Sequence, residues 1–262
     1  MSKSLKVLLV LLCFVFVGIF VISGYQLIST LGEYKAAQDT YENVSKQFVS
    51  AAPTATPAPV ETGSGEVTEP EVELSPINVD FAALLSQNTD VRGWIYCEGT
   101  MLNYPIAQGK DNDYYLERLI DHTWNPSGTL FMDFRNAPDF TSFNTLIYGH
   151  NMNDGSMLHM IRKYVDQAYY DAHPVFYLNT TEKNYKVELF SGYITDAESD
   201  AYTMGFPDEQ SYLNFIDKLL RRSNFDSPVE PTAADRIVTF STCSYEYDNA
   251  RYVLHGRLVP IG

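Results

Sequence analysis

The chain has 262 residues and a formal net charge of −15 at pH 7. Binding of nucleic-acid phosphates needs clustered lysine and arginine, and no basic stripe occurs here, so the composition argues against a nucleic-acid partner. The length allows one domain of ordinary size plus accessory segments. The 19 tyrosines and 15 phenylalanines, with strand-like segments outnumbering helical ones, predict a mainly β domain.

An apolar run near the N-terminus predicts a membrane anchor at residues 7–28. A spanning helix needs about 20 predominantly apolar residues, and this segment supplies them. Lys3 and Lys6 precede the run, which places residues 1–6 in the cytoplasm and the rest of the chain outside the cell. The alternative is a cleaved signal peptide. Residues 23–25 are a poor cleavage site, so we favour an uncleaved, single-pass signal anchor.

Two segments follow the anchor before the predicted domain. Residues 29–50 predict a polar juxtamembrane helix. Residues 51–76 contain prolines among threonine, alanine, glutamate and glycine, and they lack the apolar content needed to fold. They predict a disordered linker that holds the domain off the membrane. The folded domain is therefore predicted at residues 77–262.

Short strands dominate the predicted domain. Asp80 is expected to cap a short helix that buries Phe81, Leu84 and Leu85. An amphipathic helix is predicted over residues 208–222, inserted between two strands. Strands are predicted at residues 93–97, 102–107, 129–134, 145–148, 175–178, 185–195, 237–242 and 251–258, with small helices at 113–119 and 157–164.

Metal and disulfide chemistry find little support in the sequence. The three cysteines include Cys13 in the apolar run, so only Cys97 and Cys243 could meet in the folded domain. No C-x-x-C or H-x-x-x-H spacing occurs, so no zinc site is predicted. Residues 111–113 (Asp-Asn-Asp) lack the EF-hand spacing and glycine, and we interpret them as a turn or helix cap. Cys97 is expected to be buried and inert.

The end of the chain carries the strongest chemical signal. Cys243 lies at the end of one predicted strand and Arg251 at the start of the next, across a polar turn. A cysteine facing an arginine is placed for acyl transfer, because a fixed guanidinium can stabilise the developing oxyanion. The residues alone leave two alternatives open. The cysteine could be a small buried hydrophobe, and the arginine could form a surface salt bridge with Glu246 or Asp248.

A cysteine nucleophile needs a basic partner, usually histidine. His150 follows residues 148–149 at a strand end, where a rigid scaffold can present reactive groups to a cleft, and it is the favoured partner. His255, on the Arg251 face of the last strand, is the second choice and could instead be a core histidine. Of the other three histidines, His122 is expected in a surface loop, His159 in a helix and His173 in a connection between elements.

These segments together resemble class B sortases. The family pentad T-L-x-T-C appears at residues 239–243, with Phe240 in place of the usual leucine. The family's histidine segment appears at residues 148–152 and its arginine at Arg251. The resemblance covers about residues 77–259 and the N-terminal anchor. Other similar segments are residues 103–106, 111–116, 128–136 and the helix at 208–222.

The resemblance implies an eight-stranded sortase-type β-barrel with N-terminal helices and a helix between strands six and seven. It also implies a cysteine transpeptidase on the outer face of the membrane of a Gram-positive-type cell. In that family pattern Cys243 is the nucleophile, His150 the acid and base, and Arg251 the oxyanion donor. The resemblance further suggests three residues near the substrate groove: Ser241, Asn103 and Tyr202.

The implied partners are secreted proteins with a C-terminal sorting signal similar to N-P-x-T-N. Cleavage after Thr gives a thioester, and the acyl group then passes to an amine of a cell-wall precursor or a pilin. No cofactor or metal is implied. Two alternatives remain: an endopeptidase that only hydrolyses, although the papain-type signature is absent, and a non-catalytic surface-binding module with a structural Cys243.

Overall fold

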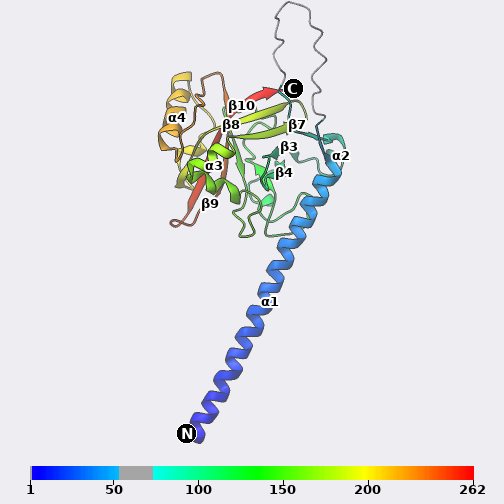
Figure 1. Ribbon diagram of the computed structural model, residues 1–262, viewed down its shortest axis with the longest axis vertical. Coiled ribbons are helices and arrows are strands. Elements are labelled where there is room, and N and C mark those ends of the chain that lie inside the picture. Colours follow the sequence, from blue (N-terminus) through cyan, green and yellow to red (C-terminus); the bar gives the residue numbers. More distant parts are fainter. Residues whose placement is uncertain (1, 53–72) are drawn as a thin grey trace, which may run out of the picture.

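The computed structural model describes residues 2–52 and 73–262. Most of the predicted linker at 51–76 therefore lies outside the described residues. Within the described parts, a closed barrel forms the centre of the molecule and a long helix leaves it toward the N-terminus (Figure 1).

Eight strands close the barrel in the order β10-β8-β7-β3-β4-β5-β6-β9. Two neighbouring pairs, β4 with β5 and β6 with β9, are parallel, and the other pairs are antiparallel. In a closed barrel every strand has a hydrogen-bonded neighbour on both sides, whereas an open sheet leaves two edge strands with unpaired backbone groups. The predicted eight-stranded barrel is confirmed. The strands are β3 (Val91–Tyr96), β4 (Asn103–Ala107), β5 (Leu130–Met132), β6 (Asn144–Tyr148), β7 (Val175–Thr180), β8 (Asn184–Asp196), β9 (Arg236–Cys243) and β10 (Ala250–Ile261).

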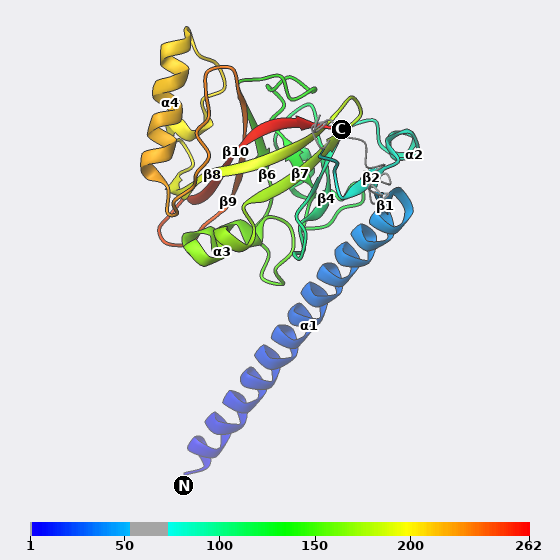
Figure 2. The same ribbon diagram turned by 45° about the horizontal axis from the view of Figure 1, so that its top comes forward.

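Strand β9 is buried on both faces because two hydrophobic clusters lie on either side of it. Val238 and Phe240 belong to the main core, whereas Ile237 belongs to a second cluster beneath α4 (Glu209–Arg222). Side chains alternate across a strand, so a run of β-branched and aromatic residues can fill both clusters. Helix α4 follows β8 and precedes β9, the sixth and seventh barrel strands, as the resemblance implied (Figure 2).

The remaining helices, apart from the N-terminal one, are shorter than α4. Helix α2 (Phe81–Gln87) begins as predicted, with the Asp80 carboxylate accepting a hydrogen bond from the Ala83 amide at 3.0 Å, and Leu84 is buried. The two segments predicted as small helices form 3-10 helices, η1 (Tyr114–Leu116) and η2 (His159–Val165). The remaining ones are α3 (Gln167–Ala172) and η3 (Asp200–Tyr202).

The predicted span and juxtamembrane helix form one continuous helix, α1 (Lys3–Phe48). Its N-terminal part is long and apolar enough to cross a membrane, and side chains such as Phe14 and Phe20 are exposed there. Its C-terminal part docks on the barrel, where Tyr41 is buried. The Tyr41 hydroxyl lies 2.6 Å from the Gly128 carbonyl oxygen, and its ring meets the Tyr104 ring edge-on.

The ends of the proline-rich segment are paired with each other. Strand β1 (Val49–Ala51) runs antiparallel to β2 (Ile77–Val79), with Ala51 opposite Ile77. Backbone hydrogen bonds therefore join the described residues on either side of this segment. Helix α1 itself joins the apolar span to the barrel. The sequence had predicted that residues 51–76 act as the spacer between membrane and domain. The packed body also begins before Ile77, because the end of α1 belongs to its core.

Replacing Tyr41 by alanine is expected to lower the free energy of unfolding by about 3–5 kcal/mol, because the variant loses a buried aromatic ring and its hydrogen bonds. Denaturant titration of the full chain in detergent micelles measures the loss. Lys35→Ala on the same helix is the control, since its exposed pair with Asp39 is worth less than about 0.5 kcal/mol. Equal stabilities of the two variants would show that α1 does not stabilise the barrel.

Candidate active site

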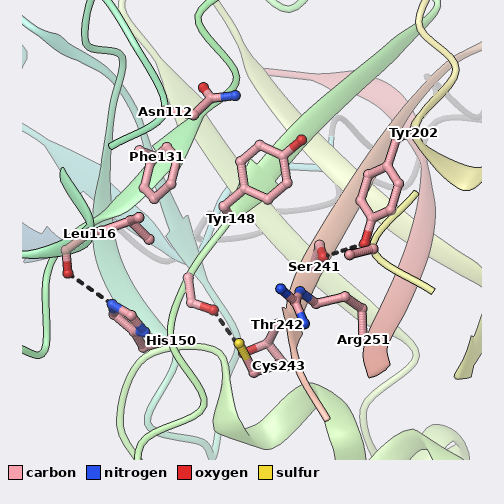
Figure 3. A pocket seen from close by; sticks show the side chains of 12 residues that line it. Asn112, Leu116, Phe131, Tyr148, His150, Tyr202, Ser241, Thr242, Cys243 and Arg251 are labelled. Atoms are coloured by element: carbon pink, nitrogen blue, oxygen red, sulfur yellow. Dashed lines mark hydrogen bonds between the residues drawn. The ribbon is translucent and has the colours of Figure 1, made fainter. Parts of the chain in front are cut away.

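A pocket of about 260 Å³ opens where β6 and β9 end and β10 begins (Figure 3). It combines aromatic and apolar walls with a few polar groups, which is typical of a ligand-binding site. Its walls come from Asn112, Leu116, Phe131, Tyr148, Gly149, His150, Ala197, Tyr202, Ser241, Thr242, Cys243 and Arg251.

Cys243 ends β9 and lies directly opposite Arg251 of β10 in the antiparallel register. The thiol is partly exposed, so the alternative of a buried structural cysteine does not describe it. Arg251 donates a hydrogen bond to the Ala250 carbonyl at 3.0 Å. Glu246 pairs with Arg162 at 3.0 Å, and none of the ion pairs within residues 2–52 and 73–262 involves Arg251. The guanidinium therefore lines the pocket without a bound carboxylate.

His150 reaches the same pocket because β6 and β9 are parallel neighbours, and parallel strands end at the same barrel edge. Its Nε2 lies 2.8 Å from the Leu116 carbonyl oxygen. A carbonyl oxygen only accepts hydrogen bonds, so Nε2 carries a proton in this contact, and Nδ1 is the nitrogen that remains for a reacting group.

Hydrogen bonds join the end of β6 to the end of β9. The Thr242 hydroxyl donates to the Gly149 carbonyl at 2.7 Å, and the Asn151 side-chain amide donates to the Cys243 carbonyl at 2.9 Å. Gly149 has little room: a Cβ there would lie 2.3 Å from Leu130 Cδ2. These contacts hold the segments that carry the histidine and the cysteine in a fixed relation.

Two of the three predicted groove residues lie in the pocket. Tyr202 and Ser241 share a hydrogen bond of 2.9 Å between their hydroxyl oxygens, and the Tyr202 ring stacks on Tyr148 with centroids 6.3 Å apart. Burial raises the pKa of Tyr202, while the Arg251 guanidinium opposes that shift. The Tyr202 phenol therefore stays protonated and can both donate and accept hydrogen bonds in the pocket.

The structure does not bring Asn103 to this pocket. Asn103 begins β4, where its side-chain oxygen accepts from the Trp94 indole at 2.7 Å. Its side-chain nitrogen donates to the Ser45 hydroxyl of α1 at 3.0 Å. The Asn103 amide thus joins β3 to α1 through its two ends, and Asn103 lines a separate hollow beside that helix.

The sequence reasoning missed several residues that line the pocket, among them Asn112, Leu116 and Phe131. Each lies in a segment that the resemblance had marked without giving it a role. Asn112 was interpreted only as part of a turn. Residues 111–116 and 128–136 lie at the same barrel edge as the predicted site. The sequence could have indicated this only if the strand order had been known.

The other candidates for chemistry lie away from the pocket. His255 is fully buried, its Nδ1 lies 2.8 Å from the Thr239 hydroxyl, and burial lowers its pKa to about 3. It is the core histidine that the sequence left as a possibility. Cys97 is buried as expected, and burial raises the pKa of its thiol to about 11. No cluster of potential metal ligands occurs among the described residues.

A closed barrel with a cysteine, a histidine and an arginine in one groove fits the class of cysteine transpeptidases that the sequence resembles. Residues 95–259 match the sortase domain family. The chain is 34% identical to sortase B of Listeria monocytogenes over 250 residues, covering 95% of each chain. It is 30% identical to sortase B of Staphylococcus aureus over 263 residues, covering 100% of this chain and 99% of that one.

Solved structures give the same result. A Staphylococcus aureus sortase B–substrate complex superposes with a TM-score of 0.67 and 34% identity, over 70% of this chain and 85% of that chain. Sortase B from Bacillus anthracis in complex with AAEK1 superposes with a TM-score of 0.71 and 30% identity, over 88% of this chain and 99% of that chain. The protein belongs to the sortase family of cysteine transpeptidases.

Proposed function

We propose that the protein cleaves a C-terminal sorting signal of the N-P-x-T-N type after Thr and transfers the acyl group to an amine of a cell-wall precursor or a pilin. The observation that carries the proposal is the single pocket shared by His150, Cys243 and Arg251. The Staphylococcus aureus relative is described in complex with a substrate, which supports a peptide in the corresponding groove.

In the first half-reaction the Cys243 thiolate attacks the Thr carbonyl carbon and forms a C–S bond. The carbonyl π electrons move onto oxygen, and the Arg251 guanidinium donates hydrogen bonds to that oxyanion. The C–N bond then breaks as the intermediate collapses to a thioester. His150, as an imidazolium, gives its proton to the departing amine and becomes neutral.

In the second half-reaction an acceptor amine attacks the thioester carbonyl, and neutral His150 takes the proton that the amine loses. The C–S bond breaks, a new amide forms, and Cys243 leaves as a thiolate. The fixed strand ends support this double role of His150, because one side chain must serve both the leaving and the incoming amine.

We also propose the orientation of the chain in the membrane. Residues 1–6 are cytoplasmic, α1 spans the bilayer, and the barrel lies outside the cell. The two lysines before the apolar run and the length of α1 support this topology. The substrates are then secreted proteins that reach the same face of the membrane.

Transfer and hydrolysis can be separated with the full chain in detergent micelles, an N-P-A-T-N peptide and triglycine as an acceptor amine. The expected result is a Thr–glycine amide product whose yield rises with acceptor concentration, at the expense of the free Thr acid. If only the acid forms at saturating acceptor, the protein is a hydrolase. If neither product forms from peptides with varied residues around the Thr, the proposed reaction is wrong.

A further inference from the structure

Asp133 lies directly after β5, in the segment 128–136 that the mechanism above does not use. Its side chain is fully buried and does not line the pocket. Its Oδ2 atom accepts from two pocket residues, the Asn112 side-chain nitrogen at 2.9 Å and the Tyr148 hydroxyl at 3.0 Å. One oxygen thus holds two side chains that come from different parts of the barrel.

Arg135 completes the set of partners around this carboxylate. Its guanidinium lies 2.8 Å from Oδ1 and 2.7 Å from Oδ2, and its backbone amide donates to Oδ1 at 3.0 Å. Burial raises the pKa of Asp133, but the hydrogen bonds from Arg135, Asn112 and Tyr148 outweigh burial and lower it to about 2. The carboxylate therefore stays ionised throughout the physiological pH range and can only accept hydrogen bonds.

An ionised partner determines which hydrogen-bonding groups remain for the pocket. Tyr148 must donate its only hydroxyl proton to Asp133, so its oxygen keeps only lone pairs for a ligand. The Asn112 oxygen accepts from the Phe134 backbone amide at 3.1 Å, so its NH₂ group faces Asp133 and one N–H remains free. The wall then offers one donor and one acceptor side by side, which suits a neutral peptide amide better than a charged group.

The backbone around Asp133 is fixed to β6, which carries Tyr148. The Asp133 amide donates to the Leu146 carbonyl at 2.9 Å, and the Asn136 side-chain oxygen accepts from the Leu146 amide at 2.9 Å. Asn136 also donates to the Asn144 carbonyl at 2.9 Å. The carboxylate is therefore held by the strand whose side chain it orients, and it has little freedom to move away.

We propose that Asp133 is a positioning residue for the substrate peptide: it orients Asn112 and Tyr148 in the pocket wall so that their free N–H and hydroxyl oxygen face the peptide. Asp133 acts through these two side chains and touches no reacting atom. This inference rests on the proposed function, because it assigns the pocket wall to peptide binding.

Asp133→Asn in the full chain tests the proposal with the N-P-A-T-N peptide and triglycine. The substituted amide must turn its own NH₂ toward one of its former donors. KM for the peptide is expected to rise on the order of tenfold to a hundredfold, as for hydrogen bonds to a charged group, while kcat changes less. The rate of Cys243 alkylation by iodoacetamide is expected to stay within about twofold, because that rate does not depend on peptide contacts.

The KM values of further variants distinguish a positioning role of Asp133 from a purely structural one. The double variant Asn112→Ala/Tyr148→Phe is expected to have a KM near that of Asp133→Asn, and adding Asp133→Asn to it should change KM less than about twofold. Asp139→Asn is the matched control. Asp139 is an exposed carboxylate on the same loop, and it accepts hydrogen bonds from Thr141 and not from a pocket residue. It should behave as wild type.

Several outcomes would overturn the proposal. An unchanged KM in Asp133→Asn would do so, and so would a further tenfold loss on adding that change to the double variant. If Asp133→Asn does not fold, Tyr148→Phe decides, because it removes a single hydroxyl, and a wild-type KM there contradicts the proposal. Wild-type protein that makes no product with any sorting peptide would instead show that the proposed function has failed.

Discussion

Replacing Cys243 by alanine is expected to abolish both peptide cleavage and covalent trapping by a thiol-reactive peptide analogue. The proposed thioester forms on this sulfur, and no other thiol of the described residues lies in the pocket. The barrel should remain folded, because the Cys243 side chain is partly exposed and belongs to neither hydrophobic cluster. Mass spectrometry after incubation with the analogue detects the adduct, and a thermal melt checks the fold.

Cys97 provides the matched control for this prediction. Its thiol is buried, and burial raises its pKa to about 11, so very little thiolate is present near neutral pH. Cys97→Ala should therefore keep full labelling and turnover, at some cost in stability. Labelling of Cys97 in preference to Cys243, or an adduct that persists in Cys243→Ala, would remove Cys243 from the role proposed for it.

The sequence predicted the barrel strands well because their local signals agree with the fold. Residues 237–242 are β-branched or aromatic at almost every position, and the structure buries both faces of β9 between two clusters. The helix at 208–222 has a similarly clear pattern, with Tyr212, Phe215, Ile216 and Leu219 buried. Where hydrophobic periodicity alone determines an element, one sequence is sufficient to predict it.

Contacts between distant segments had no comparable signal. The pairing of β1 with β2 joins residues on opposite sides of a proline-rich segment, and each of these strands has only three residues. A short strand carries too little periodicity to be recognised. The same limit explains why the docking of α1 on the barrel was not predicted.

The structure brings the predicted site residues together where a motif fixed their position, and it differs from the prediction where position depends on side-chain packing. Cys243 and Arg251 are adjacent in register, and His150 follows a strand parallel to β9, so strand ends alone bring them together. Asn103 and Asn112 are both asparagines near strand ends. Only the structure shows that α1 covers Asn103, whereas Asn112 faces the pocket beside Tyr148.

Replacing Arg251 by alanine is expected to lower kcat by about 10²–10³, which corresponds to about 2.7–4 kcal/mol of transition-state stabilisation lost with one oxyanion donor. The guanidinium lies opposite Cys243 in register and forms none of the ion pairs of the described residues, so its donors remain available to the carbonyl oxygen. Single-turnover formation of the thioester, followed by mass spectrometry, measures the acylation step directly.

Arg162→Ala is the matched control for Arg251→Ala. Arg162 is a second arginine close to the loop between β9 and β10, but it pairs with Glu246 and does not line the pocket. Its loss should leave kcat within about twofold, since exposed ion pairs contribute about 0–1 kcal/mol.

Arg251→Lys separates charge from geometry, because lysine keeps the positive charge but lacks the planar pair of donors. Acylation by the lysine variant at the wild-type rate would show that charge alone is sufficient, and wild-type turnover of Arg251→Ala would contradict the oxyanion role.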